Sequence, residues 1–108
     1  MITVTIGRNA EELIIEFSGH SNYAPQGEDI VCAGISALTL MCANAAMLTK
    51  GRLDKMCSGY SKIMLPCNND TCFFIKALAE TLEIMAAKYP EHIRANVTPA
   101  GVTNFEKV

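Results

Sequence analysis

Residues 2–18 read ITVTIGRNAEELIIEFS, and this stretch decides the fold class. Apolar and polar side chains alternate over residues 2–8, the two-residue period of a strand buried on one face. A second apolar run, residues 12–18, follows after the short turn of residues 9–11. Two strands joined so closely predict a β-hairpin, which needs further elements to cover its apolar face.

A loop punctuated by proline and glycine follows the hairpin and leads into a long apolar segment. Asp29 is a good N-cap, so we expect a helix from Asp29 to about Thr49, with Gly51 beyond its end. Residues 30–49 carry no charged side chain, and this run of twenty is long enough to span a membrane. Its serine, threonine, asparagine and small residues make it weakly hydrophobic for a lone span. We therefore expect a buried central helix and no membrane association.

The second half of the chain predicts further strands around a second helix. Residues 52–58 are ambiguous and allow a short strand, whereas residues 59–65 alternate and predict a strand that ends at Pro66. The second helix should start at residues 68–70 and end at Tyr89-Pro90, before a closing strand over residues 93–98. Its expected core-facing residues are Phe74, Leu78, Leu82 and Met85.

The element order predicts an α+β fold, a mainly antiparallel sheet with two helices packed on one face, in the order ββαβ(β)αβ. A chain of 108 residues fits a single domain, which we place at residues 1–98, with a polar C-terminal tail at residues 99–108. Such a domain has a modest core, so a homodimer would be a natural way to bury more surface. The nine basic residues form no block and the net charge is −2, which argues against direct nucleic-acid binding.

The five cysteines are an odd number, and the opening residues read straight into a strand without a basic leader. We therefore expect free thiols in a reducing, cytoplasmic setting. Successive cysteines lie ten, fifteen, ten and five residues apart, without a Cys-x-x-Cys pair, so neither a zinc site nor another metal or cofactor is expected.

The segment from Gly19 to Cys32 carries the chemistry. His20 leaves the second predicted strand, and Cys32 is the third residue of the first predicted helix if Asp29 is its N-cap. The free N–H groups and the positive dipole end of a helix start both favour a thiolate. A cysteine in that position with a histidine from an adjacent element predicts a nucleophile and its base. Gly19 and Gly27 would allow close backbone approach around the pair.

Each of these residues also has an interpretation without chemistry. Cys32 can be a small apolar residue, as we expect for Cys42 in the same helix. Asp29 caps the helix, which we prefer, or orients His20, or does both. Ser36 lies on the face of Cys32, where it either bonds near the sulfur or returns its hydroxyl to a carbonyl four residues back.

Other candidates have simpler explanations. His92 suits a solvated position or a helix C-terminus without chemistry. Cys57, Cys67 and Cys72 have no histidine nearby in sequence and are expected to be structural or incidental. Methionines such as Met41, Met47 and Met85 are expected to fill the core.

Several fixed positions together resemble the signature of the ribosomal-processing cysteine protease family, Prp. These are Gly19-His20, then Gly27, Asp29-Ile30-Val31-Cys32-Ala33 and Ser36. The order of strands and helices over residues 1–98 also agrees with this family. Ser21 stands where alanine is common, a small change that leaves the pair of His20 and Cys32 intact. The tail after Thr98 is longer than expected for the family.

The resemblance implies a cysteine endopeptidase that removes a short N-terminal extension from a large-subunit ribosomal protein. Phage-borne relatives act on capsid or scaffold proteins. It implies cleavage after an aromatic-rich segment with phenylalanine just before the cut, and a homodimer. By position, Cys32 matches the nucleophile and His20 the general base, and Asp29 and Ser36 match other signature positions. Two rival functions remain: a non-catalytic dimeric protein that binds a peptide or the ribosome, and a thiol-dependent redox or acyl-transfer protein.

Overall fold

The protein is described here from a computed structural model that covers residues 1–25 and 27–97. The C-terminal tail expected at residues 99–108 lies outside the described residues. Seven elements follow one another along the chain in the predicted order. They are β1 (Ile2–Arg8), β2 (Glu12–Ser18), α1 (Ile30–Leu48), β3 (Arg52–Cys57), β4 (Tyr60–Pro66), α2 (Asn69–Lys88) and β5 (Ile93–Val97).

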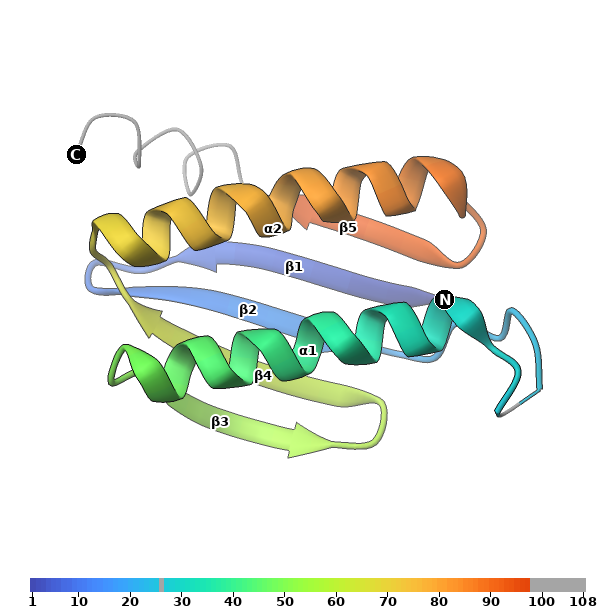
Figure 1. Cartoon of the computed structure of the whole chain (residues 1–108), viewed down its shortest axis with the longest axis horizontal. Coiled ribbons are helices and arrows are strands. Elements are labelled where there is room, and N and C mark those ends of the chain that lie inside the picture. The colour runs from blue at the N-terminus through green and yellow to red at the C-terminus, as the bar shows by residue number, and fades with distance from the viewer. Residues whose placement is uncertain (26, 98–108) are drawn as a thin grey trace.

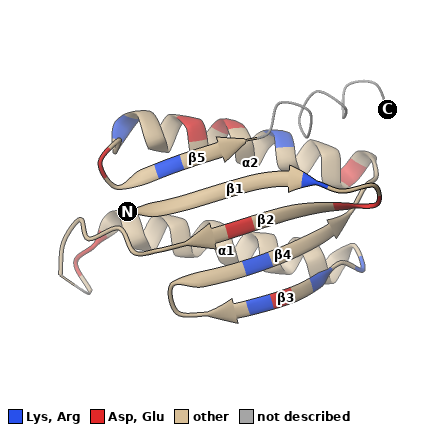
Figure 2. Ribbon diagram, turned by 180° about the vertical axis from the view of Figure 1, so that it is seen from behind, with Lys and Arg blue, Asp and Glu red and all other residues tan. Residues whose placement is uncertain are grey.

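The five strands form one sheet in the order β3-β4-β2-β1-β5. All neighbours pair antiparallel except β1 and β5, which run parallel because α2 carries the chain back across the sheet. Figure 1 shows both helices on one face of the sheet, and Figure 2 shows the strands lying open on the other. The predicted α+β class with two helices on one face is confirmed.

The core lies between the sheet and the two helices. The side chains of β1 and β2 alternate as predicted. Every second side chain is buried in the core through most of each strand. Helix α2 contributes the predicted stripe, in which Leu78 and Leu82 are buried and Phe74 and Met85 pack partly against the same cluster. The fully buried residues include Val4, Ile6, Leu13, Ile15, Ile63, Leu65, Ile75 and Leu82.

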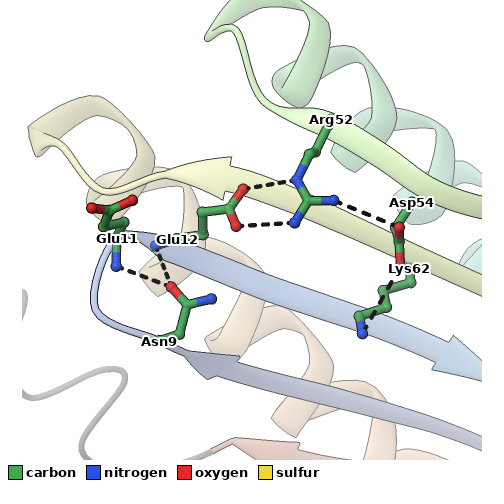
Figure 3. A network of polar contacts seen from close by, with 6 residues as sticks. All are labelled: Asn9, Glu11, Glu12, Arg52, Asp54 and Lys62. Carbon is green, nitrogen blue, oxygen red and sulfur yellow. Dashed lines mark hydrogen bonds and ion pairs between the residues drawn. The ribbon is translucent and has the colours of Figure 1, made fainter.

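A group of polar side chains joins the edge strand β3 to the rest of the sheet, at the end where β2 begins (Figure 3). The Arg52 guanidinium reaches across β4 to the Glu12 carboxylate, with a shortest N–O distance of 3.1 Å, and also approaches Asp54. Asn9 accepts hydrogen bonds from the backbone N–H groups of Glu11 and Glu12 and so closes the first hairpin. Exposed ion pairs of this kind contribute little to stability because water screens them, so this group fixes geometry more than stability.

Helix α1 has the predicted bounds and the predicted N-cap at Asp29, but its burial differs from the prediction. Only 22% of the most apolar 18-residue segment of α1 is buried inside the protein, although this segment has a mean hydropathy of 1.8. Met41 and Met47 are exposed, so their expected role in the core is wrong. The sheet covers one side of a helix that is apolar on all sides. The exposed large apolar residues of α1 are Ile30, Leu40, Met41, Met47 and Leu48, and we call the last four the outer face of α1.

Within the described residues, α1 is the one helix that is long and apolar enough to cross a membrane. Length and composition alone are weak grounds for a span, because core helices of globular proteins pass the same test. Val31, Ile35, Cys42 and Ala46 of α1 are buried in the common core, which ties the helix to the sheet.

Candidate active site

Two cavities meet at His20 and Cys32. Both cavities are lined by His20, Cys32, Ser36 and Ser58. These four side chains come from three places: the end of β2, the first turns of α1, and the turn between β3 and β4. All three lie at the same end of the sheet in Figure 1. The structure therefore brings the predicted nucleophile and base to one site, with both side chains exposed to solvent.

Cys32 is the third residue of α1, as predicted from the position of its cap. Its backbone N–H donates to the Asp29 Oδ1 atom at 2.8 Å, and the Ala33 N–H donates to the Asp29 carbonyl at 3.0 Å. The sulfur thus sits on the first turn of the helix, where the dipole end is positive. The Cys32 amide is occupied by this bond and is not free to hold a substrate oxygen.

Asp29 joins the helix start to the loop that carries His20. Its Oδ2 atom accepts from the Ser21 hydroxyl and from the backbone N–H groups of Tyr23 and Ala24, at 3.1 and 3.4 Å for the two amides. Within the described part of the chain none of its hydrogen bonds goes to the His20 ring, which favours the capping role. Desolvation opposes ionisation of this carboxyl, but the hydrogen bonds outweigh it and lower its pKa from 3.8 to about 2.

This low pKa predicts how the site responds to acid. The Asp29 carboxylate should stabilise the fold fully above its unfolded pKa of 3.8, and this contribution should be lost as pH falls toward about 2. The stability difference between the wild type and Asp29→Asn should therefore be constant above pH 4 and shrink below it. Urea unfolding at a series of pH values measures the difference. A gap that stays constant down to pH 2 would contradict the assignment.

Two glycines hold the His20 ring in place. Gly19 adopts a φ of +97°, and its N–H donates to the Gly59 carbonyl at 2.9 Å. Gly59, in the turn between β3 and β4, has a φ of +79°. A Cβ atom on Gly59 would lie 2.9 Å from the His20 Nε2 atom, so this turn forms a wall against which the imidazole rests.

The contact between His20 and the turn at Ser58 and Gly59 was not predicted from the sequence. Residues 59–65 were predicted as a strand, whereas β4 begins at Tyr60 and Gly59 belongs to the turn. A Ser-Gly pair before an alternating run is a turn signal, and it could have placed Ser58 and Gly59 at a hairpin. Their proximity to His20 depends on β4 pairing with β2, which the local sequence does not specify.

Ser36 and Gly27 contribute in different ways. Ser36 lines both cavities. The hydroxyls of Thr39, in α1, and Thr49, at its C-cap, donate to carbonyls four residues back. Gly27 adopts a φ of +92° with nothing within 4 Å of a Cβ built on it. Gly27 is thus needed for the backbone conformation of the loop rather than for close approach.

One of the two cavities is mainly apolar and has a volume of about 370 Å³. It opens beside Cys32 and runs between α1 and the ends of β1, β2 and β4. Its apolar walls include Ile2, Phe17, Ile35, Leu40 and Tyr60. Within the described residues no three His, Cys, Asp or Glu side chains gather as metal ligands would.

Comparison with known proteins agrees with the family resemblance. A protein-family model described as Cysteine protease Prp matches residues 1–94. The chain belongs to the Prp family of cysteine proteases. The ribosomal processing cysteine protease Prp of Staphylococcus aureus strain Mu50 is 34% identical over 104 residues, covering 89% of this chain and 98% of the relative. The Prp of Bacillus subtilis strain 168 is 40% identical over 53 residues, 47% of each chain.

Two crystal structures of the S. aureus Prp protease have the same fold. One, in complex with a covalently linked product peptide, aligns with a TM-score of 0.72 at 30% identity and covers 91% of this chain and all of the other. The second, in complex with a substrate peptide, aligns with a TM-score of 0.66 at 29% identity over the same shares of the two chains. This chain is thus a cysteine protease by family, with the fold of relatives that bind peptides.

Proposed function

We propose that this Prp family member is an endopeptidase in which Cys32 is the nucleophile and His20 the general base. The observation that carries the proposal is the meeting of two cavities at these two side chains. A thiol on the first turn of a helix beside an imidazole has the arrangement of an activated cysteine. Asp29 serves as the cap that fixes the helix start and the loop together.

In this mechanism the Cys32 sulfur attacks the carbonyl carbon of the scissile peptide bond, and the thiol proton passes to His20. The imidazolium then protonates the leaving amine as the C–N bond breaks, which leaves a thioester on Cys32. Water, activated by His20, hydrolyses the thioester and restores the thiol. Because the Cys32 amide is held by Asp29, we propose that the hydroxyl of Ser36 or Ser58, which line both cavities, donates to the developing oxyanion.

The apolar cavity suggests which residue precedes the cut. A phenylalanine ring needs an apolar pocket next to the nucleophile, and the cavity beside Cys32 has walls of that character and a volume suited to one large side chain. We propose that this cavity holds the aromatic residue of an aromatic-rich segment. We further propose that the described loop residues between His20 and α1 cover the bound peptide, because Ser21, Asn22, Ala24 and Gly27 line the second cavity.

The substrate we propose is a large-subunit ribosomal protein with a short N-terminal extension. The support is the name of the relatives, which are ribosomal processing proteases, together with the peptide complexes of the S. aureus protein. A phage capsid or scaffold protein with a similar segment is the alternative substrate. Incubating the enzyme with each precursor and sequencing the new N-termini distinguishes the two.

We also propose a cytoplasmic homodimer without direct nucleic-acid contact. The outer face of α1 (Leu40, Met41, Met47 and Leu48) presents large apolar side chains to solvent, which a second copy would cover. The free cysteines among the described residues suit a reducing compartment. Light scattering should give twice the monomer mass, and a monomer at micromolar concentration would contradict the dimer.

Alkylation tests the proposed pair directly. Cys32 and Cys57 are both exposed, whereas burial raises the pKa of Cys42 to about 12 and also raises that of Cys72. Iodoacetamide should therefore modify Cys32 at least about tenfold faster than its exposed counterpart Cys57, because Cys32 lines both cavities together with His20 whereas Cys57 lines neither. His20→Ala should remove the difference, as followed by peptide mass spectrometry. Equal rates in the wild type, with no peptide cleavage, would favour the non-catalytic binding protein.

A further inference from the structure

The loop between His20 and Cys32 is held by a side chain that lies far away in the sequence. The structure assigns His92, at the junction of α2 and β5, as a positioning residue of the active site. His92 fixes residues 21–25 against this junction and thereby sets the positions of both His20 and Cys32. This inference rests on the roles proposed above for those two residues.

A hydrogen bond carries the first step of the argument. The His92 Nδ1 atom lies 2.8 Å from the Ser21 carbonyl oxygen. A carbonyl oxygen only accepts, so Nδ1 must carry the proton in this bond. Ser21 directly follows His20 and is only 2% exposed, so the bond holds a backbone segment that is already sequestered from water. It therefore acts on the residue next to the proposed base.

Two aromatic contacts add to this bond. The Tyr23 ring meets the His92 ring edge to face, with centroids 5.2 Å apart and planes at 81°. The same ring meets Tyr89 at 5.6 Å and 83°. Edge-to-face ring pairs of this kind stabilise the packing beyond the apolar area that they bury. The loop is thus held at two points, the Ser21 carbonyl and the Tyr23 ring.

His92 can fix the loop because its own backbone is fixed. Its carbonyl accepts from the Ile2 N–H at 2.8 Å, where β5 begins to pair with β1. Its N–H donates to the Tyr89 carbonyl at 3.0 Å, and the next residue, Ile93, is buried. The imidazole therefore projects from the most constrained part of the junction rather than from a free chain end.

The connection continues from Ser21 to the nucleophile. The Ser21 hydroxyl donates to Asp29 Oδ2, and Asp29 Oδ1 accepts from the Cys32 N–H. One unbroken set of contacts thus runs from His92 through Ser21 and Asp29 to Cys32, with His20 attached at Ser21. A shift of about 1 Å in catalytic groups can cost as much as 100-fold in rate, so loss of the His92 bond should lower turnover.

Substitutions at His92 separate the hydrogen bond from the ring contact. His92→Phe keeps a ring against Tyr23 but removes the N–H, whereas His92→Asn places an amide N–H near the position of Nδ1. We expect His92→Phe to lower kcat about tenfold with a smaller change in KM, and His92→Asn to recover most of the loss. The pH profile of His92→Asn should match the wild type, because His92 transfers no proton. Asn68→Ala, which breaks the capping box of α2 without touching the loop, is the control for lost stability.

Hydrogen exchange gives a second readout that does not need catalysis. The amides of Tyr23, Ala24 and Cys32 all donate to Asp29, so their exchange should speed up several-fold in His92→Phe, return in His92→Asn and stay unchanged in Asn68→Ala. Wild-type exchange in His92→Phe, or a His92→Asn variant no better than His92→Phe, would overturn the assignment. If cleavage persisted in Cys32→Ala, the proposed mechanism would fail while the exchange data still decided the role of His92.

Discussion

Cys32→Ala should lose peptide cleavage by about 10⁴-fold or more, because the proposed mechanism has no other sulfur at the meeting point of the two cavities. The same variant should keep its fold. Cys32 is exposed, and its backbone N–H rather than its side chain holds the cap. An exposed substitution of this kind changes stability by about 0.5 kcal/mol or less. The variant should also still bind the aromatic-rich peptide, since the apolar walls formed by Ile2, Phe17, Ile35, Leu40 and Tyr60 are unchanged.

Cys57→Ala is the matched control for this experiment. Cys57 is the other fully exposed cysteine among the described residues, and it lies in β3 outside both cavities. Cleavage of a peptide with paired phenylalanines, followed by mass spectrometry, should be normal in Cys57→Ala and absent in Cys32→Ala. Retained cleavage by Cys32→Ala would rule out Cys32 as the nucleophile, and binding measured by calorimetry would show whether the loss is one of chemistry alone.

Gly59→Ala should lower kcat/KM about 100-fold, although Gly59 bears no reactive group. The added Cβ would lie 2.9 Å from the His20 Nε2 atom, so the imidazole must move away from the wall that now supports it. A displaced base loses alignment with the thiol, and misplacement of this size has large kinetic effects. The left-handed φ of +79° adds a separate cost of about 1–2 kcal/mol for any residue with a Cβ.

A double-mutant cycle separates these two effects of Gly59→Ala. The stability of the wild type, Gly59→Ala, His20→Ala and the double variant is measured by urea unfolding. Strain in φ should remain in the His20→Ala background, whereas the clash with the ring should vanish with the ring. The loss of stability from Gly59→Ala should therefore be smaller when His20 is absent. An equal loss in both backgrounds would mean that Gly59 acts through backbone strain alone.

The features that were predictable from the sequence are local ones. Strands β1 and β2 show their period of two because one face of each is buried, and the predicted bounds coincide with the structure. The N-cap at Asp29 placed Cys32 on the first turn of α1. Strand β3 was ambiguous for a physical reason: all six of its residues are exposed at the sheet edge, so burial imposes no pattern on them.

The features that escaped prediction depend on contacts across the chain. His92 was expected to be solvated or at a helix end, whereas it contacts Ser21, a residue 71 positions away. That contact exists because β5 pairs parallel with β1. The local sequence around His92 does not specify this strand pairing or its register. The exposure of Met41 and Met47 was not predicted because of the composition of their own helix. A helix that is apolar all round has no polar side to reveal which face the sheet covers.

The proposed catalytic residues and the polar group around Arg52 lie at opposite ends of the sheet. His20 lies just beyond the end of β2 at Ser18. The turn that contains Asn9 and the Arg52 side chain lie at the other end, where β2 begins. Seven extended residues span about 20 Å, so the hairpin tip is remote from the sulfur. A fluorophore or a short affinity tag grafted at Ala10 would report on the enzyme without entering its chemistry. The same distance should let this tip accept an insertion without disturbing the proposed catalytic residues at the other end of the sheet.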